Sequence, residues 1–165
     1  MKNPGPVPNF YQTEDWILRG GQPSAEGLKE LKEKNVKTIV NLRWKGQAIE
    51  WEKKIVTELG IDFIHIPLNY WTLPTASHFD QFLSYVDDPQ KRPLFVHCYH
   101  GADRTGLFIA LYRIARCGWT IDQAYDEMVN CGFHRFKTRH FKWALKLLAA
   151  YARQRHAAYC KLTPE

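Results

Sequence analysis

The sequence has few cysteines and no long apolar run. Its four cysteines form no CxxC pair and no zinc-ligand spacing with the seven histidines, so a disulfide-stapled miniprotein is excluded and no metal is expected. The longest apolar run, Leu107–Ala115, is interrupted by Arg113 and falls well short of the roughly 20 residues that a membrane helix needs. We therefore expect a soluble globular protein with no integral membrane contact.

Repeats, low-complexity tracts and linkers are also lacking. At 165 residues, against about 150 per domain, the chain predicts a single domain over residues 1–165. Its 23 Lys plus Arg exceed its 17 Asp plus Glu, and the net charge of +6 favours an anionic ligand such as a phosphorylated small molecule or protein. Basic charge alone supports a nucleic-acid partner only weakly, so we predict none, and we expect a monomer.

Hydrophobic periodicity predicts alternating strands and helices. Strands are expected at 15–19, 36–42, 61–68 and 93–97, and helices at about 24–34, 48–59, 76–86, 105–115, 120–130 and 138–156. The inward face of the second helix is expected to hold Trp51, Ile55, Val56 and Leu59. This alternation indicates an α/β fold with a mainly parallel central sheet and helices on both faces. Because ligands bind beyond the carboxyl ends of such strands, the segment after His97 is the candidate site.

That segment reads HCYHGADRTG, from His97 to Gly106. A loop wrapped around a helix N-terminus points backbone N–H groups inward and makes a cradle for a tetrahedral anion. The same positive field stabilises a thiolate, so Cys98 is the candidate nucleophile, and Arg104 supplies a planar fork for two phosphoryl oxygens. A lone cysteine after an apolar strand is usually just buried, but this spacing between a strand and a helix favours catalysis.

The other loop positions also have candidate roles. Gly101 and Gly106 suit places where a Cβ would clash with the loop or the ligand. The Thr105 hydroxyl can hydrogen-bond the Cys98 sulfur and ease its departure when water cleaves a phosphocysteine. The candidate substrate-binding residues of the loop are Tyr99, His100, Gly101 and Ala102.

The pattern of His97-Cys98, five residues, then Arg104-Thr105-Gly106 resembles the signature of the cysteine-dependent protein tyrosine and dual-specificity phosphatase superfamily. Further segments resemble a bacterial dual-specificity-like branch, related to plant and fungal atypical phosphatases: 9–11, 19–24, 26–28, 38–43, 118–119 and 132–134. The resemblance covers about residues 9–153. It implies a small parallel-sheet domain that hydrolyses phosphate monoesters through a phosphocysteine, without a metal or organic cofactor.

The expected general acid is missing. The resembled enzymes usually protonate the leaving oxygen with an aspartate on a separate loop, but residues 69–74 contain none. Asp103 lies inside the cradle, and an Asp-Arg-Thr ending resembles inositide and inositol-phosphate phosphatases with a proposed in-loop acid. A helix cap, or a partner that orients a basic side chain, is an equally good interpretation. Phosphoanhydrides and aryl phosphates need no acid, which keeps inositol pyrophosphates among the candidate substrates.

Several residues outside the cradle are further candidates. Arg43 and Lys45 are expected on the binding face together with Trp44, with a solvated strand end as the alternative. His97 either orients Cys98 or simply packs, and Trp71 either walls the pocket or packs in the core. A basic cluster fits a phosphate-rich substrate, RNA, a lipid headgroup or merely a solvated helix start, and consists of His134, Arg135, Lys137, Arg139 and His140.

Three classes of function stay open at this point. A phosphatase is the leading interpretation, and a phosphate-binding module that has lost turnover is the second. A sulfurtransferase or arsenate reductase can use a similar cradle, although no second shuttling cysteine is evident from the spacing. Residues 1–12 contain three prolines and no apolar signal core, so we predict a cytoplasmic protein, or a periplasmic or exported one if a signal peptide was removed.

Overall fold

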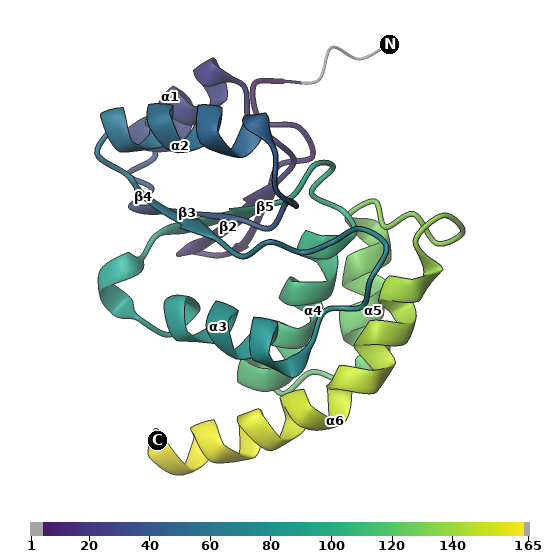
Figure 1. The fold of residues 1–165 in the computed structure, drawn as a ribbon. Coiled ribbons are helices and arrows are strands. Elements are labelled where there is room, and N and C mark those ends of the chain that lie inside the picture. Colours follow the sequence, from purple (N-terminus) through teal and green to yellow (C-terminus); the bar gives the residue numbers. More distant parts are fainter. Residues whose placement is uncertain (1–4, 164–165) are drawn as a thin grey trace.

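The computed structural model describes residues 5–163 and has an α/β fold (Figure 1). Its elements are β1 (Tyr11–Glu14), β2 (Ile17–Gly20), α1 (Ala25–Glu33), β3 (Thr38–Asn41), α2 (Gln47–Glu58), β4 (Asp62–His65), α3 (Ala76–Val86), the 3₁₀ helix η1 (Pro89–Lys91), β5 (Leu94–His97), α4 (Arg104–Cys117), α5 (Ile121–Asn130) and α6 (Arg139–Leu162). The strand order is β1-β2-β5-β3-β4, with β1 antiparallel to β2 and the other neighbours parallel. The predicted fold class is confirmed.

Helices cover both faces of the sheet (Figure 1). The helices α1 and α2 lie on one face, and α3 to α6 lie on the other. The larger apolar core lies on the α3–α6 side and includes Val40, Val96 and Phe108, while the smaller core includes Leu28 and Phe95. Helix α4 is buried along most of its length, as its nearly uninterrupted apolar sequence predicts.

Local sequence signals set several helix ends. Ser24 caps α1, and the predicted capping box of Thr120 and Gln123 begins α5. Helix α4 ends at Cys117 and is capped by Gly118. The φ of Gly118 is 68°, in the left-handed region that favours glycine because it has no Cβ. These positions agree with the sequence because each depends on residues only a few places apart.

Three predictions need correction. The edge strand β1 is missing from the predicted elements, because its exposed sequence YQTE has no apolar alternation, and α6 continues to Leu162 instead of ending at 156. The inward placement of Trp51 is wrong: its side chain is 44% exposed, and Glu52 is the buried residue. Within residues 5–163, no helix is long and apolar enough to cross a membrane. Residues 1–4 and 164–165 of the predicted domain lie outside the described range.

Candidate active site

The loop at residues 98–103, called the cradle loop below, joins the end of β5 to the start of α4. It lies at the carboxyl edge of the parallel strands, where β2 and β3 also end. Cys98 at its beginning is 1% exposed, and Arg104 directly after it is 7% exposed. The topology therefore brings the candidate nucleophile and the candidate anion clamp, both buried, to the two ends of one short loop.

The cradle loop packs tightly against the glycine pair at the end of β2, Gly20 and Gly21. Gly101 has φ 73°, and a Cβ built there would lie 2.2 Å from the carbonyl carbon of Gly20. On the other side, a Cβ on Gly21 would lie 2.9 Å from the Tyr99 carbonyl oxygen, and Gln22 N donates to that same oxygen at 3.0 Å. The two backbones approach so closely that glycine is required in both segments.

Arg19 lies beneath the cradle loop and is 1% exposed. Its Nη2 donates to the Gly101 carbonyl oxygen at 3.0 Å, whereas its Nε and Nη1 are buried without a hydrogen-bond partner within residues 5–163. Burial lowers the pKa of this guanidinium, against attraction from neighbours that include Cys131 and Cys98. The sequence does not reveal this role of Arg19, because the carbonyl oxygen that it contacts belongs to Gly101, 82 positions later.

The end of the loop at Cys98 is held by a buried pair. His97 Nδ1 donates to the Cys98 carbonyl oxygen at 3.1 Å, and His97 Nε2 lies 2.7 Å from Glu52 Oε1. Both side chains are fully buried. Burial opposes ionisation of Glu52, but attraction to His97 and hydrogen bonds to His97, Gln22 and Asn41 outweigh it and lower its pKa. His97 is thus positioned to orient Cys98, the first of its two predicted roles.

The same carboxylate extends the network to the rim of the site. Glu52 Oε2 accepts from Asn41 Nδ2 at 2.7 Å and from Gln22 Nε2 at 2.8 Å. Gln22 Oε1 in turn accepts from Arg43 Nη1 at 2.8 Å, and the Arg43 guanidinium lies 5.1 Å from the centre of the Tyr99 ring. The sequence analysis missed Glu52, Gln22 and Asn41, because their partners lie on elements far apart in the chain.

A cavity of about 270 Å³ opens above the cradle loop. The residues that line it are Arg43, Trp44, Lys45, Tyr70, Tyr99, His100 and Arg104. Arg43, Lys45, Tyr99 and His100 are thus brought together as candidate substrate-binding residues, whereas Gly101 and Ala102 are buried and do not line the cavity. Trp71 takes neither expected place: it is 79% exposed, and the neighbouring Tyr70 forms the wall.

Charge in the cavity is carried by cations. Arg104 Nη1 donates to the Leu68 carbonyl oxygen at 3.3 Å, and its Nε is buried without a partner within residues 5–163. Burial and the neighbouring His134 lower the pKa of His100, so it adds little charge at neutral pH. No carboxylate belongs to the described residues that line the cavity.

Asp103 is not among the residues that line this cavity and is 2% exposed. Its carboxylate accepts from His134 N at 3.1 Å and from Thr138 Oγ1 at 2.8 Å, and it lies 2.9 Å from His134 Nδ1. It makes no capping bond to α4. This geometry favours the role of a partner that orients a basic side chain, since a carboxylate occupied in this way is poorly placed to protonate a leaving oxygen.

Thr105 differs from its expected arrangement. The side chain is fully buried, and its Oγ1 has no hydrogen-bond partner within the described residues. The expected bond to the Cys98 sulfur is therefore absent in this structure. A buried hydroxyl without a partner still leaves a donor available to a charged sulfur or a bound oxyanion.

Comparisons with known proteins agree with the geometry. A family model described as "DSP-PTPase phosphatase fused to NAD+ Kinase" matches residues 9–143. The chain is 32% identical over 141 residues to the dual specificity protein phosphatase TpbA of Pseudomonas aeruginosa, covering 78% of this chain and 56% of TpbA. It is 25% identical over 147 residues to the inositol diphosphatase DSP5 of Arabidopsis thaliana, covering 84% and 69% of the two chains.

The fold likeness is also broad. The crystal structure of the core catalytic domain of the PP-IP phosphatase SIW14 from S. cerevisiae superposes with a TM-score of 0.80 at 19% identity, covering 96% of each chain. The chain spans about half the length of the first curated relatives that it matches, 56% of each TpbA sequence. The family model, over residues 9–143, includes the whole cradle loop.

Proposed function

This chain belongs to the DSP-PTPase phosphatase family, and we propose on that basis that it hydrolyses phosphate monoesters through a phosphocysteine on Cys98. The observation that carries the proposal is the placement of the buried Cys98 and Arg104 at the two ends of a short loop at the N-terminus of α4. The positive end of the α4 dipole favours both the thiolate and the bound phosphoryl group.

The proposed reaction has two steps. The Cys98 sulfur attacks phosphorus in line, a P–S bond forms, and the ester or anhydride P–O bond breaks with its electron pair on the leaving oxygen. Water then attacks phosphorus, the P–S bond breaks, and phosphate and the thiolate are released. Arg104 binds the equatorial oxygens and contributes most as their charge rises in the transition state.

The substrate class follows from charge. Arg43, Lys45 and Arg104 line the cavity without a carboxylate beside them, which supports a multiply phosphorylated anion. The lack of a carboxylate also favours a phosphoanhydride, whose leaving group needs no proton. We therefore place an inositol pyrophosphate first, the class named for DSP5 and SIW14.

Phosphotyrosine is the second candidate, because aromatic side chains form part of the cavity. Tyr99 and Trp44 are 55% and 46% exposed at its mouth, and Tyr70 adds a third ring. Such rings are suited to contact an aryl group, and an aryl oxygen also leaves without a strong acid.

The test is phosphate release from an aryl phosphate, a phosphotyrosine peptide, a phosphoserine peptide and an inositol pyrophosphate. We expect the inositol pyrophosphate and the aryl substrates to react and the phosphoserine peptide to react least. Cys98→Ser should abolish turnover but still bind substrate, while Cys117→Ser, an exposed cysteine at the far end of α4, should change neither. Turnover by Cys98→Ser, or tight binding without any release by the native chain, would reject the mechanism.

Lys45→Ala separates the two substrates. Loss of one cation should raise KM for the inositol pyrophosphate about tenfold and leave a small aryl phosphate nearly unchanged. An equal effect on the KM of both substrates would indicate that Lys45 does not bind a second phosphate.

A further inference from the structure

Positive charge is concentrated in the last part of the chain. From Met128 to Pro164 there is no Asp or Glu, but eight cations: Arg135, Lys137, Arg139, Lys142, Lys146, Arg153, Arg155 and Lys161. Before Met128, 15 Lys plus Arg face 16 Asp plus Glu, so that part is nearly neutral. The net charge of the molecule therefore comes from one segment, which consists largely of α6 and the loop before it.

Large apolar side chains are exposed in the same segment. Phe136 is 92% exposed, Leu147 66% and Trp143 63%. Neighbouring apolar residues of α6, such as Phe141 and Leu145, are buried in the core, so the exposure is specific to one face of the helix. Exposed apolar residues that cluster on a surface mark an interaction site more often than single ones do.

These residues form one surface. Arg139, Trp143, Lys146 and Leu147 follow each other at helical spacing on the side of α6 opposite to its buried face, and Arg135, Phe136 and Lys137 lie in the loop that leads into it. We call these seven residues the α6 surface. None of its four cations forms an ion pair with a carboxylate within residues 5–163.

The α6 surface begins beside the candidate active site. The His134 ring lies 5.1 Å from the ring of His100, which lines the cavity above the cradle loop. His140 Nε2 lies 2.7 Å from the carbonyl oxygen of Tyr70, another cavity residue. The exposed Trp71 follows Tyr70 directly, which places a further aromatic side chain near this end of the surface.

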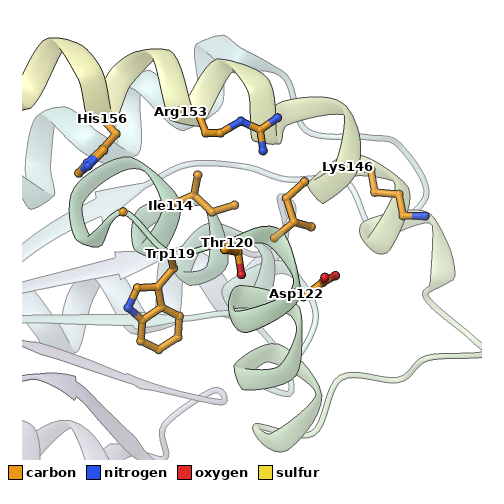
Figure 2. Close-up of a pocket in the computed structure, with 9 residues that line it drawn as sticks. Ile114, Trp119, Thr120, Asp122, Lys146, Arg153 and His156 are labelled. Carbon is orange, nitrogen blue, oxygen red and sulfur yellow. The ribbon is translucent and has the colours of Figure 1, made fainter.

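A second hollow continues the positive charge along α6. This cavity of about 670 Å³ lies between α6 and the connection from α4 to α5 (Figure 2). Lys146, which belongs to the α6 surface, lines it together with Arg153 and His156. Ile114, Trp119 and Ile121 give it an apolar lining, and Asp122 is its one carboxylate among the described residues.

We infer that the α6 surface docks on an anionic lipid membrane. Its cations match lipid phosphates, and Phe136, Trp143 and Leu147 protrude from a helix and a loop as interfacial side chains do when they enter the headgroup region. A nucleic acid would use the cations but gains little from an exposed leucine. A hollow of about 330 Å³ is lined by Arg135, Phe136 and Lys137 of this surface, but neither Trp143 nor Leu147 lines it, so it takes in too little of the surface to hold a peptide partner. Docking would bring the mouth of the active site close to the lipid surface.

The inference goes beyond the proposed function and does not require turnover. Its test is co-sedimentation of the full chain with vesicles of mixed phosphatidylglycerol and phosphatidylcholine, compared with phosphatidylcholine alone. We expect binding to the anionic vesicles, weakening as salt is raised, and little binding to the neutral ones. Lys137→Glu with Lys146→Glu should weaken binding about tenfold or more.

The apolar part has its own variant and a matched control. Phe136→Ser, Trp143→Ser and Leu147→Ser together should also weaken binding about tenfold or more. The control carries Trp51→Ser, Lys53→Glu and Lys54→Glu on exposed positions of α2, on the opposite face of the sheet, and should bind like the native chain. All variants should hydrolyse a soluble aryl phosphate at the native rate.

Several results would overturn the inference. These are no binding to anionic vesicles at low salt, equal binding to neutral vesicles, the same loss in the α2 control, or retention of heparin or RNA without vesicle binding. Vesicle binding by a chain that turns over no phosphate would reject the proposed function and leave the docking surface in place. The two proposals therefore fail separately.

Discussion

Two buried carboxylates hold the two ends of the cradle loop from different parts of the fold. Glu52, on α2, fixes the Cys98 end through His97, and both side chains of that pair are fully buried. Asp103 fixes the Arg104 end, but its partner His134 has a side chain that is 41% exposed. Cys98, the proposed nucleophile, is therefore anchored in the core. Asp103, next to Arg104, is anchored to the segment before α6 through the half-exposed His134 and the buried Thr138.

This difference predicts that the two ends of the loop move with different ease. The Cys98 end depends on groups that move only when the core opens, whereas loops with few buried contacts open at much lower free energy. A change at His134 or Thr138, which contact the Asp103 carboxylate, would displace Asp103, and Arg104 with it, while leaving Cys98 and His97 in place. The predictions below test this asymmetry.

The largest effect is expected for Glu52→Gln. This change leaves His97 without its charged partner in the core, and breaking a buried pair costs about 3 kcal/mol or more. Urea denaturation at neutral pH measures the loss, and kcat/KM for an aryl phosphate should fall because Cys98 is no longer fixed. A loss below about 1 kcal/mol would show that hydrogen bonding without charge suffices at this position.

The pH dependence of stability sharpens the same point. Because the pKa of Glu52 is lower in the folded than in the unfolded chain, its contribution is present above the ordinary pKa of about 4.3 and is lost as pH falls through the folded value. As the pH drops below about 4.3, the urea midpoint of the native chain should therefore decrease more steeply than that of Glu52→Gln. Parallel curves would contradict this assignment.

Asp103→Asn should have a smaller effect. The amide can keep part of the contact to His134 and Thr138, so we expect a stability loss of about 1–2 kcal/mol. Rates on aryl and alkyl phosphates should fall by the same modest factor. A selective loss on the alkyl phosphate would instead identify Asp103 as the proton donor. The control is Asp122→Asn, an exposed aspartate of α5.

The smallest effect is expected for Thr138→Val. It removes one hydroxyl that donates to Asp103 and contacts the His134 carbonyl oxygen, at a cost of about 1 kcal/mol. Equilibrium unfolding gives the stability change, and the KM for phosphate substrates should rise more than kcat falls, since only the Arg104 end is loosened. A change in the pH profile of Cys98 alkylation would show that the two ends are not independent.

The sequence predicts the parts of the molecule that local chemistry determines. The capping box of Thr120 and Gln123 and the apolar face of α3 depend on nearby residues, and both are found where expected. The cradle loop is also local, since Cys98 and Arg104 stand six positions apart between a strand and a helix. Short-range patterns of this kind are the most reliable sequence signals.

Residues whose role depends on distant partners could not be found in this way. Glu52 looks like the solvated side of an amphipathic helix beside Trp51, and only His97, 45 positions away, explains its burial. The role of Arg19 is equally hard to predict, because its contact is the carbonyl oxygen of Gly101, 82 positions later in the chain. In both cases tertiary contact overrides the local preference for water.

The hydrogen-bonded chain from Cys98 through His97, Glu52 and Gln22 to Arg43 has a consequence for redesign. If the proposed function holds, replacing Arg43 to change the substrate preference would also alter the support of Cys98, so gains in selectivity would carry a rate penalty. Lys45 also lines the cavity but has no hydrogen bond to this chain within residues 5–163. Its Nζ lies 5.6 Å from the centre of the Trp44 ring. Directed evolution should therefore begin at Lys45, where the choice of substrate can change while the reaction centre stays intact.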